Sequence, residues 1–329
     1  MSITLSRPVA ALALLCSATL LLAETPTQVL LPDAPALVLA DVGYALKLPV
    51  SDAVPYQGMV DKDAGAGQAG AMLYPAFGLI GALAAVATHG IIVEASKNSE
   101  RSRLQASADK VLTPYSDAIA GFSQRAMMQQ ALDGLSGAGT RKVLAATEPA
   151  ESGWVIETAT RFSLNTDVTA MVLDAPVLVY AADQPTEPRY RNMVHVVSDP
   201  RPVVPAGEAA AEARNLRLKQ DSIALMAHAM QALLADLASE RRPGQPASSD
   251  RTVRYQEGSV LRSERGQVLS EHCGRVVLRN LRGWLMSVPQ RQSPGSTVDP
   301  SCGVPAAVPT AAPAATPLES TVANIDKPA

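Results

Sequence analysis

The chain has 329 residues and a formal net charge of −3. This mild acidity argues against nucleic-acid binding, which calls for a clear positive excess. Apolar residues make up 47% of the chain, which is enough for a folded core, although only 4% of the residues are aromatic.

Residues 1–23 have one basic side chain, Arg7, followed by an apolar run that ends at Ala23. This pattern predicts a secretory signal peptide, whose removal would change the formal charge from −3 to −4. Cys16 raises the alternative of lipidation, but Leu15 stands where a lipoprotein signal has a small residue, so cleavage after Ala23 is favoured. We therefore expect an exported bacterial protein, periplasmic or membrane-associated in the cell envelope.

Residues 24–63 contain several prolines, short β-like runs and an acidic balance, so we expect an extended acidic segment. The next thirty residues, 64–93, carry no charged side chain and are rich in Gly and Ala. A bilayer core about 30 Å thick needs roughly 20 apolar helical residues, so the run is long enough to span it. Because Gly and Ala contribute little transfer energy and Pro75 and His89 weaken the run further, a buried or interfacial helical hairpin with the polar helix that follows is slightly favoured over a full span. A true span would run N-out, C-in, since the flank that follows is the more basic one.

Small residues recur along one side of this run at helical spacing, which lets backbones approach closely. They are Gly78, Gly81, Ala82, Ala85 and Gly90. The segment resembles the glycine-zipper segments of bacterial envelope proteins, and that resemblance implies membrane association or self-association. Residues 65–70 also fit G-x-G-x-x-G, but no buried strand precedes them, so we expect no dinucleotide cofactor.

The remaining chain predicts an α+β fold. Polar helices follow the Gly/Ala run within 64–135, and an α+β domain occupies 150–289. In that domain two β stretches flank a long amphipathic helix, 207–240, whose apolar stripe includes Leu216. We expect one antiparallel sheet covered by this helix. Residues 290–329 are rich in Pro and Ala, with few bulky side chains, and predict a disordered tail.

Arginines are frequent in the second β stretch, where apolar residues alternate with them. Two interpretations stay open: the solvated face of an amphipathic sheet, or a basic face for an anionic envelope ligand. The arginines concerned are Arg254, Arg262, Arg275, Arg279 and Arg282. Cys273 and Cys302 could form one disulfide worth about 3 kcal/mol, with two free thiols as the alternative.

No spacing of titratable residues indicates a catalytic or metal site, so the sequence predicts no enzyme, cofactor or metal. The expected function is that of a non-enzymatic exported envelope protein, associating with membrane or with itself through the Gly/Ala run. Other envelope components are further candidate partners. The alternative is a periplasmic binding or assembly module that uses the Arg-rich β surface, 251–282, for an anionic envelope ligand.

Overall fold

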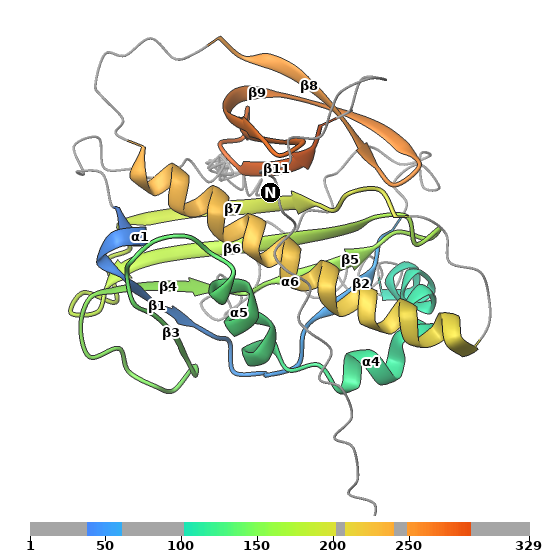
Figure 1. Cartoon of the computed structure of the whole chain (residues 1–329), viewed down its shortest axis with the longest axis horizontal. Helices are drawn as coiled ribbons and strands as arrows, with labels where there is room; N and C mark the ends of the chain where they lie inside the picture. The colour runs from blue at the N-terminus through green and yellow to red at the C-terminus, as the bar shows by residue number, and fades with distance from the viewer. Residues whose placement is uncertain (1–37, 61–101, 202–207, 240–248, 291–329) are drawn as a thin grey trace, which may run out of the picture.

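The computed structural model describes residues 38–60, 102–201, 208–239 and 249–290 (Figure 1). The predicted signal peptide, the Gly/Ala run with Gly78, Gly81, Ala82, Ala85 and Gly90, and the predicted tail lie outside these residues. Residues 102–108 are helical. The other helical elements are α1 (Leu39–Val42), the 3-10 helix η1 (Asp109–Tyr115), α4 (Ser116–Ala120), α5 (Gln124–Asp133) and α6 (Glu208–Ala238).

The strands of the described residues form one mixed sheet of 11 strands, so the fold is α+β. They are β1 (Tyr44–Lys47), β2 (Tyr56–Gly58), β3 (Arg141–Leu144), β4 (Trp154–Thr158), β5 (Arg161–Leu164), β6 (Met171–Ala181), β7 (Tyr190–Val197), β8 (Arg251–Glu257), β9 (Val260–His272), β10 (Arg275–Asn280) and β11 (Leu285–Pro289). The main order is β3-β1-β4-β6-β7-β11-β10-β9-β8.

The expectation of a purely antiparallel sheet is wrong, because strands from distant parts of the chain join it in parallel. β1 inserts between β3 and β4, so that Leu46 pairs with both Val143 and Ile156. β11 likewise runs parallel to β7. Adjacent strands in the sequence favour hairpins, but these three parallel pairings join segments that are far apart in the chain.

Strand β6 is long enough to pair with two strands placed end to end. Its second half pairs with β4 and its first half with β5, both antiparallel. β2 extends the sheet beside β5 in parallel. Residues 38–60 therefore contribute two strands and a short helix to the fold, where the sequence predicted an extended segment.

The helices before β3 are short. Pro114 lies inside η1. A separate helix, α5, begins after Ser123, whose hydroxyl accepts a hydrogen bond from Ala126 N and donates one to Asp52 Oδ2. Such N-caps satisfy backbone donors that the first helical turn leaves open.

Helix α6 packs diagonally against β6, β7 and β11, and also against α5 (Figure 1). Its apolar stripe begins at Leu218, which is fully buried, whereas Leu216 is 52% exposed. Within the described residues no helix is both long and apolar enough to cross a bilayer. The buried α6 side chains of the main core include Leu218, Leu225, Met226, Met230, Leu233 and Leu237.

A second, smaller core lies where β8–β11 curl away from the rest of the sheet. Tyr255 of β8 forms an isolated antiparallel bridge with Gln290, just after β11. This contact brings the last strand of the sheet order back towards β11. The core consists of Val172, Val197, Val253, Tyr255, Val276, Leu278, Met286 and Val288.

A buried polar network joins α6 to two strands. The carboxylate of Asp236 has no exposed area, and it accepts a hydrogen bond from the Arg279 guanidinium of β10. The Tyr190 hydroxyl of β7 donates to its second oxygen at 2.7 Å. Asn192 donates in turn to the Tyr190 hydroxyl at 2.9 Å. The network therefore ties α6, β7 and β10 together.

Replacing Asp236 by Ala should lower the free energy of unfolding by about 3–5 kcal/mol, because the Arg279 charge then lies poorly compensated in the interior. Urea denaturation measures this change. Asp117→Ala, at an exposed position of α4, is the control and should change stability by under about 0.5 kcal/mol. Adding Arg279→Leu to Asp236→Ala should recover part of the loss; no recovery would contradict the explanation.

Candidate functional site

The structure does not gather the five predicted arginines on one solvent-facing surface. Arg275 is buried, and its Nη2 donates to the carbonyl oxygens of Val197 and Ser287 at 2.6 and 3.0 Å. Its Nη1 also donates to Asp199 Oδ1 at 3.1 Å. Arg279 donates to the buried Asp236. These two guanidinium groups are therefore engaged in contacts within the protein.

The other three predicted arginines lie nearer the surface. Arg254 is exposed on β8. Arg262 Nη2 lies 3.6 Å from Glu257 Oε1, and the Arg282 guanidinium lies 5.4 Å from the centre of the Trp284 ring. A basic face built from the five predicted arginines would therefore keep these three residues and lose Arg275 and Arg279.

Cys273 occupies the turn between β9 and β10, followed by Gly274. Both residues have positive φ angles, +52° and +68°, as a tight hairpin turn of the primed type requires. Cys302 lies outside the described residues. The disulfide between the two cysteines stays a prediction.

A hydrogen-bonded closure joins the two ends of the segment 61–101, which contains the Gly/Ala run. The backbone N–H of Gly58, at the end of β2, donates to Asp109 Oδ1 at 2.7 Å. Gln105 Nε2 donates to the Gly58 carbonyl at 2.9 Å and to Asp109 Oδ1 at 2.7 Å. The residues that flank this segment on its two sides therefore lie in contact with each other.

The closure requires glycine at position 58. A Cβ atom there would lie 2.0 Å from the carbonyl oxygen of Ala108 and 2.7 Å from Asp109 N. Those atoms belong to the backbone of the returning helix, so they cannot yield by a side-chain rotation. The absence of a side chain lets β2 and the start of η1 approach closely.

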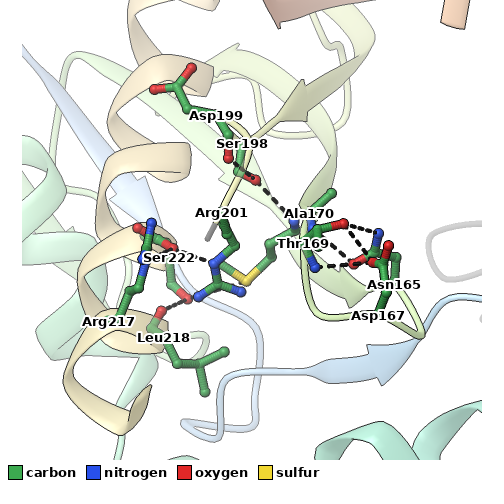
Figure 2. A network of polar contacts seen from close by, with 12 residues as sticks. Asn165, Asp167, Thr169, Ala170, Ser198, Asp199, Arg201, Arg217, Leu218 and Ser222 are labelled. Atoms are coloured by element: carbon green, nitrogen blue, oxygen red, sulfur yellow. Dashed lines mark hydrogen bonds and ion pairs between the residues drawn. The ribbon is translucent and has the colours of Figure 1, made fainter. Parts of the chain in front are cut away.

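An arginine cluster, defined as Arg201, Arg214 and Arg217, lies at the N-terminal half of α6, and all three positive charges act on Tyr115. Figure 2 shows Arg201 and Arg217 beside this helix. Arg201 extends from the segment after β7, and its Nε lies 2.7 Å from Asp221 Oδ2 of α6. Arg217 Nε lies 3.7 Å from the same carboxylate oxygen. Burial raises the pKa of Asp221, although Arg201 and Arg217 act in the opposite direction.

The backbone that carries Arg201 is held by the turn between β5 and β6. Arg201 N donates to the Thr169 carbonyl at 2.8 Å, and Ala170 N donates to Asn165 Oδ1 at 2.8 Å (Figure 2). Val168 in this turn has φ +61°, an unusual value for a β-branched residue. The turn thus fixes the backbone position from which the Arg201 side chain extends.

Two aromatic hydroxyl side chains border the arginine cluster. The hydroxyls of Tyr56 and Ser222 lie 2.7 Å apart, and Ser222 is the neighbour of Asp221 on α6. Burial raises the pKa of Tyr56 to about 12. Burial also raises the pKa of Tyr115, at the end of η1, while all three arginines of the cluster act to lower it.

One histidine–carboxylate pair lies on the sheet. His195 Nδ1 is 2.7 Å from Asp174 Oδ1, across the β6–β7 register. Among the residues that the structure describes, no three His, Cys, Asp or Glu side chains converge in a way that could hold a metal ion.

Neither the closure nor the arginine cluster was identified from the sequence. The spacing of Arg214, Arg217 and Asp221 does place them on one face of the predicted helix, which was an available signal. Arg201 reaches that face only through the packing of α6 on the sheet. Gly58 and Asp109 are separated by the whole Gly/Ala run, so no local pattern connects them.

Comparison with known protein families, with curated proteins and with solved structures finds no match to this chain.

Replacing Gly58 by Ala should lower the free energy of unfolding by about 3 kcal/mol, because the new methyl group collides with the Ala108 backbone. Chemical denaturation of the purified protein measures the change. Gly121→Ala is the matched control, since its Cβ would meet the Asp117 carbonyl oxygen at 3.5 Å, an ordinary contact. Equal stability of the two variants would argue against a tight closure.

Proposed function

We propose that the protein is a non-enzymatic, exported cell-envelope protein that associates with a membrane or with a second copy of itself through the Gly/Ala run. The observation that carries this proposal is the closure between Gly58 and Asp109. It makes the uncharged run an insertion into a folded domain. Both ends of the insertion start from the same part of the domain surface.

The closure opposes a single crossing of the bilayer. After one crossing, the run would end on the side opposite the domain, and the chain would have to return through the membrane to reach Gln105. The returning stretch, 94–101, carries Glu94, Lys97, Glu100 and Arg101. Each such charge costs about 3 kcal/mol at the centre of a bilayer.

The length of the uncharged run argues against two crossings of the bilayer. Two membrane-spanning helices need roughly 40 apolar residues, whereas the uncharged run has thirty. As one continuous helix the run would measure about 45 Å, which leaves about half of that for each leg of a hairpin. The proposal is therefore association from one side, as an interfacial or partly inserted hairpin, in place of the N-out, C-in span.

The alternative of an anionic ligand on the Arg-rich β surface has less support. Arg275 and Arg279 make their hydrogen bonds inside the protein. Of the five predicted arginines, Arg254, Arg262 and Arg282 would remain for this surface, and two of these already contact Glu257 or Trp284. Arg251 and Arg265 are also exposed in this stretch, and Arg251 forms an ion pair with Glu271.

Single cysteines at positions 62 and 97 should both react with a membrane-impermeant maleimide from the same side as the domain. The reason is that the closure returns the chain to its starting point. The variants Lys62→Cys and Lys97→Cys are made in a background in which Cys16, Cys273 and Cys302 are Ser. Labelling is measured in cells with a permeabilised outer membrane.

Lys142→Cys marks the side on which the domain lies, since the Lys142 side chain is 64% exposed on β3. Equal labelling of positions 62, 97 and 142 supports one-sided association. Protection of position 97 while positions 62 and 142 react would contradict it and indicate a single span.

Introducing leucine at Gly78 and Gly81 together should weaken self-association, because bulky side chains keep two helix backbones apart. Chemical cross-linking of intact envelopes measures the amount of dimer and larger species. Ala76→Leu with Ala87→Leu is the matched control, since these positions lie opposite the small-residue stripe on an ideal helix. A cross-linking pattern that is the same in both double variants would reject packing through the stripe.

A further inference from the structure

The arginine cluster brings together three positive charges from two parts of the chain. Arg214 and Arg217 lie on one face of α6, together with Asp221 one turn further on. Arg201 reaches the same turn of α6 from the segment after β7 (Figure 2). The positive charges of all three guanidinium groups act to lower the pKa of Tyr115. The cluster is thus a local concentration of positive charge in an otherwise mildly acidic protein.

The described carboxylates do not balance this charge. Asp221 is the carboxylate in contact with the cluster, and it is shared by Arg201 and Arg217. A second acidic group, Asp199, acts through its charge to raise the pKa of Asp221. It is largely exposed and accepts a hydrogen bond from Arg275. Two of the three arginines, Arg201 and Arg217, therefore share one closely placed carboxylate among the described residues.

Two donors of the cluster also have no hydrogen-bond partner in the described part of the chain. They are Nη1 of Arg201 and Nε of Arg214, both without exposed area. The Arg201 side chain is only 4% exposed, so water at the surface does not reach it freely. Burying an ionised donor without an acceptor costs free energy. A negatively charged acceptor would remove this cost.

We propose that the arginine cluster binds a small oxyanion of the phosphate class. Guanidinium groups present planar sets of N–H donors that match the oxygens of such an anion. Arg217 gives the route of entry, because its side chain is 35% exposed and leads from solvent towards Asp221 and Arg201. The site uses no residue of the Gly/Ala run, and the proposal does not rest on membrane or self-association.

The test is the binding of inorganic phosphate to the purified full chain, by calorimetry and by the midpoint of thermal unfolding. Phosphate should raise the midpoint above the value in sodium chloride of equal ionic strength. Arg217→Gln should weaken binding about tenfold by removing one charged donor pair. Arg191→Gln, at an exposed position of β7, is the matched control and should bind phosphate as the unaltered protein does.

Asp221→Asn separates ligand binding from a structural role. If the cluster binds an anion, removing the competing carboxylate tightens phosphate binding, and phosphate restores the midpoint that the variant loses. If the arginines serve only as partners of Asp221, the variant is destabilised and phosphate does not restore it, which would overturn the proposal. Phosphate that acts no more strongly than chloride on the unaltered protein would also overturn it.

A second comparison distinguishes the source of the oxyanion. Vesicles of neutral phospholipid with and without phosphatidic acid are offered to the full chain and to Arg217→Gln. If the natural ligand is a free small oxyanion, phosphate binds to the protein in solution. Arg217→Gln then leaves the retention of the protein on vesicles unchanged. Loss of retention on acidic vesicles in this variant, without phosphate binding in solution, would contradict a small-molecule site.

Discussion

The buried carboxylate of Asp236 is the contact on which the arrangement of the domain depends most. A buried ion pair stabilises only when its geometry and its other hydrogen bonds are satisfied. Arg279 of β10 and Tyr190 of β7 both supply hydrogen bonds to Asp236, so α6 can neither slide nor rotate without breaking them. Asp221 lies fifteen residues earlier, about four helical turns, and therefore on nearly the same face. Fixing Asp236 thus also fixes where Asp221 meets Arg201.

The second constraint is the close approach at Gly58. β1 and β2 belong to the same sheet as strands that come after the uncharged run, and β1 lies between β3 and β4. The sheet cannot be completed unless the chain returns from the run to where it left. This makes residues 38–60 an integral part of the domain, and it makes the run an insertion whose ends are held together by Gly58, Gln105 and Asp109.

Periodicity in the sequence was enough to predict the α+β class, the long helix and the main strands. Alternation in β6 and β7 and the apolar stripe of α6 are local signals, and the structure has a strand or a helix at each. The parallel partners of β1 and β7 were missed because pairing between distant segments leaves no local pattern. Arg275 and Arg279 were misjudged for a related reason: they flank a short apolar run, 276–278, and nothing local shows that they are buried. Their acceptors, Asp199 and Asp236, come from other elements.

The closure and the arginine cluster are connected through β2 and η1. Tyr56 lies two residues before Gly58, and its hydroxyl is 2.7 Å from that of Ser222, which donates to the Leu218 carbonyl on α6. Tyr115 ends the same 3-10 helix that begins with Asp109. A change at the closure can therefore alter the position of two side chains that border the cluster. Arg191 lies on β7, outside this connection, so a change there leaves both β2 and η1 in place. An effect on oxyanion binding that arises at Arg217 but not at Arg191 consequently reports on the cluster itself.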